Sequence, residues 1–174
     1  MLTTLIDEVK GTGTQKELSE IGRKLLLKGV QTEYGLSEIP EISFGVFGKP
    51  YFRSHPDIHF NISHCDKAVV CALSDSVVGI DVESVRPFDR EMAEYVSAPE
   101  EFKSILTSAD PAVAFTILWT RKESYCKMTG QGLNTPKEIR EILMVNHARF
   151  HTTINKAGGY IVTLCQPDFP PARR

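Results

Sequence analysis

Apolar residues recur three or four positions apart near the start of the chain. The recurring positions are Leu18, Ile21, Leu25 and Leu26. This spacing predicts an amphipathic helix over about residues 16–30, which Gly29 or Gly35 would end. The first dozen residues lack such a pattern, so we expect an irregular start with a turn at residues 11–13.

Short apolar runs follow and predict β-strands. The runs are residues 43–47, 58–62, 68–73 and 77–83. Gly48-Lys49-Pro50 is typical of a turn, and Ser74-Asp75-Ser76 of a hairpin connection between the last two strands.

Helix signals and then strand signals appear in the second half. Asp89 is expected to cap a helix through Val96, and Ser97 to cap another from Ala98. Asp110-Pro111 predicts the start of a long helix that runs to about Met128 and stops at residues 129–132. Strands are expected at residues 139–145, 149–154 and 159–165, with a frayed tail from Pro167. Helix and strand without regular βαβ alternation indicate an α+β fold with antiparallel sheets, whose seam lies near residues 80–88.

Charge and composition narrow the class of protein. The net charge is -2, 24% of residues are charged, and no apolar run reaches the roughly 18 residues of a membrane helix. We therefore expect no nucleic-acid or membrane partner, no signal peptide and a cytoplasmic location. The four scattered cysteines predict neither a disulfide framework nor a zinc ribbon. His147 and His151 have a metal-like spacing, but their surroundings favour a strand.

Two carboxylates alternate along the segment Val78-Gly79-Ile80-Asp81-Val82-Glu83. On a strand, Asp81 and Glu83 would share one face while Ile80 and Val82 would face the core. Such neighbouring carboxylates repel each other unless a cation or protons compensate. The alternative is a half-exposed strand with two solvated acids.

The predicted long helix carries a second polar cluster in its last turns. Glu123 and Lys127 lie four residues apart and so share a face, which alone would suit an ordinary surface ion pair. Combined with the strand carboxylates, Glu123 could complete an oxygen-ligand set for Mg²⁺. Lys122 and Lys127 would then neutralise phosphate oxygens.

The segment Phe60-Asn61-Ile62-Ser63-His64 ends a predicted strand in two polar residues. Ser63 and His64 either open a turn or donate hydrogen bonds to a phosphate, and Lys49 in the preceding turn could add a cation.

These motifs occur in one order along the chain. The series is Gly48-Lys49-Pro50, Phe60-Asn61-Ile62-Ser63-His64, Val78-Gly79-Ile80-Asp81-Val82-Glu83, Trp119-Thr120-Arg121-Lys122-Glu123-Ser124-Tyr125-Cys126-Lys127 and Gly130-Gln131-Gly132-Leu133. It resembles the 4′-phosphopantetheinyl transferases, in the single-chain branch that activates peptide and polyketide synthases. The resemblance implies two similar α/β halves, residues 1–82 and 83–174, related by a pseudo-twofold axis with the site between them.

The resemblance also implies an activity and its partners. Such enzymes transfer the 4′-phosphopantetheine arm of coenzyme A to a serine of an apo acyl or peptidyl carrier protein and release adenosine 3′,5′-bisphosphate. The reaction depends on Mg²⁺, for which Mn²⁺ can substitute. A monomer is expected, with a basic or apolar groove for the acidic carrier. The carrier could belong to fatty-acid, polyketide or nonribosomal peptide biosynthesis.

Site residues follow from the matched positions. Asp81, Glu83 and Glu123 match the magnesium ligands. Lys122 and Lys127 match phosphate-binding lysines, Lys127 also assisting the departing phosphate. Three further residues match family positions that hold the nucleotide end of coenzyme A: Lys49, Ser63 and His64.

The attacking serine needs a base, because an unassisted hydroxyl is a poor nucleophile near neutral pH. Glu100 matches the family's base, with Glu101 in reserve. The competing interpretation is that Ser97 to Glu100 forms a capping box at a helix start.

Two other kinds of protein could use the same residues. One is a catalytically degenerate relative that binds a carrier protein or nucleotide, which the short N-terminal region leaves open. The other is a magnesium-dependent phosphoesterase with water as nucleophile.

Overall fold

The computed structural model describes residues 1–9, 13–132, 135–142 and 148–168. Two three-stranded antiparallel sheets form its centre. The first has the strand order β1 (Leu2–Glu8), β5 (Ala68–Ser74), β4 (His59–His64), and the second β6 (Gly79–Ser84), β8 (Tyr160–Pro167), β7 (Ala148–Asn155). This is an α+β fold, as expected.

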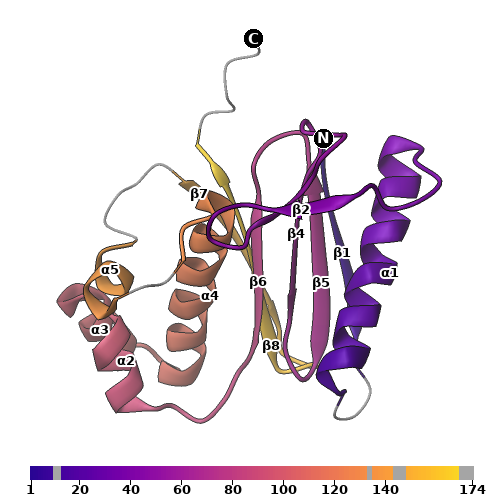
Figure 1. Cartoon of the computed structure of the whole chain (residues 1–174). Coiled ribbons are helices and arrows are strands. Elements are labelled where there is room, and N and C mark those ends of the chain that lie inside the picture. The colour runs from indigo at the N-terminus through magenta and orange to yellow at the C-terminus, as the bar shows by residue number, and fades with distance from the viewer. Residues whose placement is uncertain (10–12, 133–134, 143–147, 169–174) are drawn as a thin grey trace.

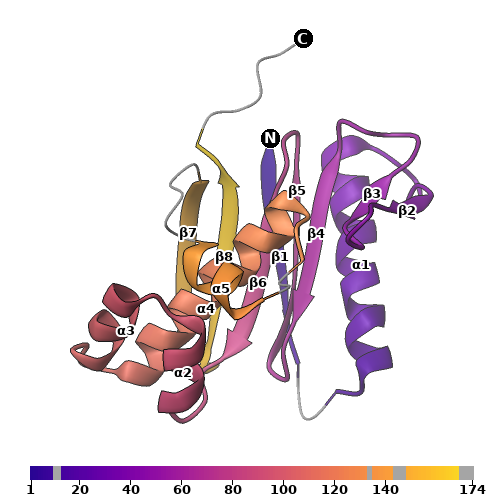
Figure 2. The ribbon, with the colours of Figure 1, turned by 60° about the vertical axis from the view of Figure 1, so that its left-hand side comes forward.

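Helices cover the outer faces of the paired sheets. The helix α1 (Gln15–Tyr34) packs on β4 and β5, and α4 (Pro111–Thr129) packs on β6 and β8. Figures 1 and 2 show α1 on one side of the sheets and α4 on the other. The short helices α2 (Arg90–Val96), α3 (Pro99–Leu106) and α5 (Pro136–Glu141) gather beside α4, and β2 (Ile42–Phe44) and β3 (Pro50–Phe52) form a separate hairpin.

The strand β5 belongs to two cores at once, which explains its continuous apolar sequence. Val69, Cys71 and Leu73 pack with α1, whereas Val70 and Ala72 pack with β6 and β8. Since successive side chains of a strand point to opposite faces, a strand buried on both faces needs apolar residues at every position.

Most predicted helix boundaries are confirmed. Thr14 and Glu17 form a capping box at the start of α1, and Gly35 ends it with a left-handed backbone conformation (φ 66°). Asp89 caps α2 and Asp110 caps α4, as predicted. The expected cap at Ser97 is displaced by one residue, because Ala98 is the N-cap of α3.

Three local predictions are wrong. The expected irregular start is the strand β1, which pairs along its length with β5. Residues 74–76 are not a hairpin turn, since β5 and β6 belong to different sheets. Residues 139–141 belong to α5 and not to a strand, while residues 143–145 lie outside the described residues, as do the predicted turn at residues 11–12 and the tail from residue 169.

Both sheets repeat one order of connections. In each, the first strand pairs with the last, which pairs with the middle one, and α1 or α4 lies between the first and middle strands. A boundary between residues 82 and 83 would cut β6, whereas one at residues 75–78 leaves both sheets whole.

The remaining sequence predictions concern cysteines, metal spacing and membranes. The four cysteines are buried and free. His151 lies on β7, and His147 lies outside the described residues. None of the helices in the described ranges is long and apolar enough to cross a membrane.

Candidate functional site

Asp81 lies where β6, β4 and α4 meet. Its side chain is buried, with the residue 2% exposed. Oδ1 accepts hydrogen bonds from Ser63 Oγ on β4 (2.8 Å) and from Lys127 Nζ on α4 (2.5 Å). Lys127 Nζ also donates to Ser63 Oγ (2.9 Å). The structure thus brings together one residue from each of three separate sequence motifs.

The strand β4 covers the edge of β6 with polar side chains. Ile80 N donates to Asn61 Oδ1 (2.8 Å), and Val82 N donates to Ser63 Oγ (3.4 Å). An uncovered edge strand would leave such N–H groups without partners. Asn61 had no assigned role, although a buried amide in an apolar strand indicates a structural hydrogen bond.

The predicted alternation along β6 is confirmed. Ile80 and Val82 belong to the core between the sheets, while Gly79 approaches α4 on the opposite face. Asp81 and Glu83 therefore project towards α4, so the alternative of two solvated acids at an open strand does not fit Asp81.

Gly79 permits the close approach of α4, and this role was missed from sequence. A Cβ atom there would lie 2.0 Å from Ser124 O and 2.4 Å from Met128 N. No side chain fits in that space. The available indication was a glycine between two apolar β-branched residues, Val78 and Ile80.

Glu83 and Glu123 flank Asp81 and share its electrostatic environment. Burial raises the pKa of Glu83 to about 7, the negative charges of Asp81 and Glu123 add to this, and Lys127 opposes it. Burial likewise raises the pKa of Glu123. The positive charge of Lys127 opposes this shift, and the negative charge of Asp81 adds to it. Three carboxylates thus lie within electrostatic range of Lys127, which pairs directly with Asp81.

A divalent cation would compensate this excess of negative charge. Among the residues that the structure describes, the buried Oδ2 of Asp81 accepts no hydrogen bond. Buried carboxylate oxygens normally have partners. In the same described part of the chain, however, no three His, Cys, Asp or Glu side chains come close enough to bind one ion. Since Mg²⁺ often takes only one or two protein carboxylates with water and substrate phosphates, the donor set fits it.

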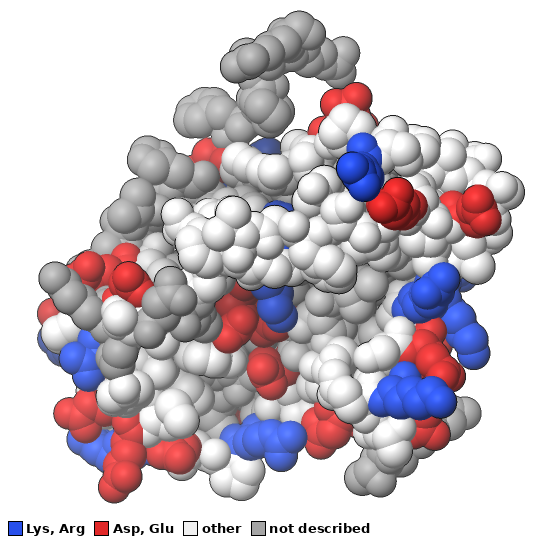
Figure 3. Space-filling model, viewed as in Figure 1, with Lys and Arg blue, Asp and Glu red and all other residues white. Residues whose placement is uncertain are grey.

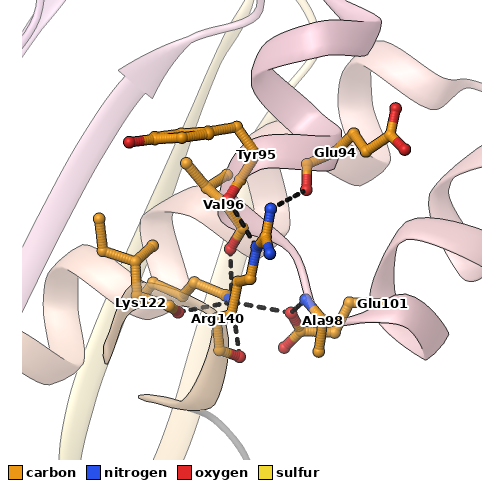
Figure 4. Close-up of polar contacts among 8 residues, drawn as sticks. Glu94, Tyr95, Val96, Ala98, Glu101, Lys122 and Arg140 are labelled. Atoms are coloured by element: carbon orange, nitrogen blue, oxygen red, sulfur yellow. Dashed lines mark hydrogen bonds and ion pairs between the residues drawn. The ribbon is translucent and has the colours of Figure 1, made fainter. Parts of the chain in front are cut away.

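Lys122 lies apart from these carboxylates. Its side chain is fully buried, and Nζ forms an ion pair with Glu101 Oε2 (2.7 Å) and donates to Val96 O (2.9 Å; Figure 4). The sequence prediction gave it phosphate oxygens as partners. In this structure protein acceptors take that place, because adjacent positions of a helix point in different directions.

Ser63 and His64 also diverge, since they are neighbours on a strand. Ser63 faces Asp81, whereas His64 Nε2 lies 3.1 Å from Gln15 Nε2 at the start of α1. The structure therefore places only Ser63 beside the carboxylates.

Lys49 connects the β2–β3 hairpin to the end of α4. Its Nζ donates to Met128 O (2.5 Å) and Val78 O (3.3 Å), and burial lowers its pKa to about 8. It lines a largely apolar pocket of about 320 Å³ between the hairpin and α4. The lining residues are Gly45, Val46, Phe47, Lys49, Pro50, Tyr51, His59, Phe60, Val77, Met128, Thr129 and Gly130.

Glu100 and Glu101 open α3 but differ in their contacts. Glu101 Oε2 accepts a hydrogen bond from Ala98 N (2.8 Å), so the capping role considered for Glu100 belongs to Glu101. Glu100 is exposed. It lines a groove between α3 and α4.

Comparison with known proteins identifies the family. The model of the 4′-phosphopantetheinyl transferase superfamily matches residues 77–171, which hold the β6 carboxylates and all of α4. The chain belongs to this superfamily. The matched range encloses the whole second sheet, from the start of β6 to the end of β8.

Individual 4′-phosphopantetheinyl transferases match most of the chain. One from Bacillus subtilis is 38% identical over 144 residues, covering 80% of this chain and 63% of its own length. The transferase Sfp of Bacillus subtilis (strain 168) is 29% identical over 168 residues, covering 86% of this chain and 75% of its own. The L-aminoadipate-semialdehyde dehydrogenase-phosphopantetheinyl transferase of Saccharomyces cerevisiae is 35% identical over 124 residues, 64% of this chain and 45% of its own. The chain thus spans less than two thirds of the length of the first of these relatives.

Proposed function

We propose that this chain transfers the 4′-phosphopantetheine arm of coenzyme A to a serine of an apo carrier protein and releases adenosine 3′,5′-bisphosphate. Two observations support the proposal: membership of the superfamily, and the contact of Asp81 with Ser63 and Lys127. The contact of Asp81 is the decisive support for the proposal, because it joins the family's carboxylate, serine and lysine motifs in a single buried cluster.

The carboxylates would serve the diphosphate of coenzyme A. We assign Asp81, Glu83 and Glu123 to Mg²⁺, one or two of them as direct ligands and the rest through bound water, because Asp81 Oδ2 accepts no hydrogen bond within the described residues and both glutamates have raised pKa values. When bound, the ion supplies positive charge that neutralises the diphosphate. Lys127 then has an acceptor besides Asp81 and Ser63, since phosphate oxygens bind ammonium groups well.

Other residues would hold or activate the two substrates. Ser63, His64 and Lys49 are assigned to the nucleotide end of coenzyme A, with Lys49 beside the apolar pocket. Glu100 is assigned as the base because it is exposed, whereas Glu101 is engaged with Lys122 and Ala98.

The transfer exchanges one phosphoester bond for another. The carrier serine Oγ attacks the phosphorus that bears the pantetheine arm, and its proton passes to Glu100. The bond from that phosphorus to the bridging oxygen of the diphosphate breaks. Lys127, near the carboxylates, stabilises the negative charge of the leaving adenosine 3′,5′-bisphosphate.

The carrier protein needs a docking surface on the same molecule. Figure 3 shows acidic and basic side chains mixed over the view of Figure 1, with a neutral surface over the β2–β3 hairpin. Phe44 and Val46 on this hairpin are 68% and 95% exposed. These features favour apolar contacts over a purely basic groove for the carrier.

Incubation of the chain with coenzyme A, Mg²⁺ and an apo carrier protein tests the proposal, with intact mass as the readout. A transferase adds the phosphopantetheine mass to the carrier. A phosphoesterase would cleave coenzyme A and leave the carrier unmodified, and a degenerate relative would leave both unchanged. Replacing the carrier serine with alanine is the control, since it removes the acceptor hydroxyl.

A further inference from the structure

The ammonium of Lys122 lies at a junction of helices. It donates to Val96 O, the last residue of α2 (2.9 Å), and to Ile139 O of α5 (2.8 Å), with Arg140 O at 3.4 Å. Figure 4 shows these contacts converging on Nζ. Carbonyl groups at a helix end lack partners within the helix, so this lysine satisfies the end of α2.

The same ammonium joins α4 to α3. Its ion pair with Glu101 is short (2.7 Å), and Glu101 Oε2 also accepts from Ala98 N at the N-terminus of α3. One carboxylate oxygen thus ties the first turn of α3 both to its own cap and to α4. Burial lowers the pKa of Lys122, while Glu101 acts in the opposite direction.

Both members of the pair stand next to a residue assigned to the chemistry. Lys122 precedes Glu123 on α4, and Glu101 follows Glu100 on α3. Consecutive helical residues are about 100° apart around the axis, so each pair member can point inward while its neighbour points elsewhere. A fixed Lys122–Glu101 contact therefore fixes the rotation of α4 relative to the first turn of α3.

We propose that the Lys122–Glu101 ion pair is a positioning element for phosphopantetheine transfer, which sets the helix turn bearing Glu100 against the helix bearing Glu123. This inference rests on the proposed function. It removes Lys122 from the group of phosphate ligands, because reaching a phosphate would leave the carbonyls of Val96 and Ile139 and the half-buried Glu101 carboxylate without this donor.

Three variants test the proposal: Lys122→Met, Glu101→Gln and the double variant. Glu101→Gln keeps an oxygen for Ala98 N and removes the charge. We expect each single variant to lower kcat about ten- to a hundredfold, because small displacements of catalytic groups have effects of this size. The Kd of coenzyme A, from calorimetry, should stay within about twofold. The double variant should lose less than the product of the two single losses.

Arg140→Met is the matched control. Arg140 also fastens α5 to α2, through Nε to Tyr95 O (2.8 Å) and a second nitrogen to Glu94 O (3.3 Å), but these contacts do not reach α3. It should lower the melting temperature with little change in kcat.

Three results would overturn the inference. A tenfold or greater rise in the coenzyme A Kd of Lys122→Met would make Lys122 a phosphate ligand. Normal kcat in both single variants, with lowered melting temperatures, would leave the pair a purely structural role. The first two results leave the proposed function intact, since the wild-type protein still transfers the phosphopantetheine arm. Absence of transfer by the wild type would contradict the proposed function and the positioning role together.

Discussion

Lys127 Nζ lies 2.5 Å from Oδ1 of Asp81, although the two residues are 46 positions apart in the chain. The contact joins the last turns of α4 to the middle of β6, and Ser63 on β4 completes it. Lys127 therefore pairs with one carboxylate and lies within electrostatic range of two more, Glu83 and Glu123, so negative charge exceeds positive charge here.

The charge of Asp81 is expected to be essential. Asp81→Asn keeps a side-chain oxygen for the Ser63 hydroxyl but removes the charge that faces Lys127. Turnover should fall by about 10²–10⁴, the range that several kcal/mol of metal-based stabilisation would give. Mg²⁺ titration by calorimetry should show weaker binding. Asp7→Asn, at an exposed position near the end of β1, is the control, and normal turnover in Asp81→Asn would refute the assignment.

Gly79→Ala should displace α4 from β6. The added methyl group would overlap the backbone of Ser124 and Met128, so the helix must move. We expect a loss of about 1–3 kcal/mol in the free energy of unfolding, measured in urea, together with lower turnover.

The control for this variant is Gly45→Ala. The nearest atom to a Cβ at Gly45 is Lys49 O, at an ordinary 3.6 Å. Equal stability of the two alanine variants would contradict the close packing of α4 on β6.

Glu100→Gln should separate catalysis from binding. If Glu100 takes the proton of the carrier serine, turnover falls by about 10²–10⁴ while coenzyme A binding is kept. The comparison variant is Glu91→Gln, another exposed acid in the first turn of a neighbouring helix. Unchanged turnover in Glu100→Gln would exclude it as the base.

Mg²⁺ affinity should fall as the pH is lowered through 7. Glu83 has a pKa raised to about 7, and a metal ligand must be deprotonated, so the ion competes with a proton. At pH 6 only about a tenth of Glu83 would be ionised, which predicts roughly tenfold weaker binding than at pH 8.

Calorimetry at several pH values, in buffers of different ionisation enthalpy, would also detect the proton released on binding. Glu83→Gln should bind Mg²⁺ more weakly and with a shallower pH dependence. Binding that is independent of pH between 6 and 8 would show that Glu83 is not a ligand.

The local sequence predicts an element correctly where the residues at its end themselves favour that end. Asp110 followed by Pro111 places the start of α4, because a side-chain acceptor and a preset backbone angle both favour a first helical turn. It failed for β1, whose residues Leu2 to Glu8 are mostly exposed and lack a clean alternation. That strand depends on its pairing with β5, which no local pattern encodes.

The candidate site divides in the same way. Carboxylates on one face of a strand and Glu123 with Lys127 on one face of a helix follow from the periods of the two elements, so the sequence alone determined them. Which lysine meets the carboxylates was decided by packing. Gly79 brings α4 onto β6 so that Lys127 reaches Asp81, whereas Lys122 points towards α3 and meets Glu101. Spacing along the chain fixes directions within one element, but the contacts between elements depend on how their surfaces fit together.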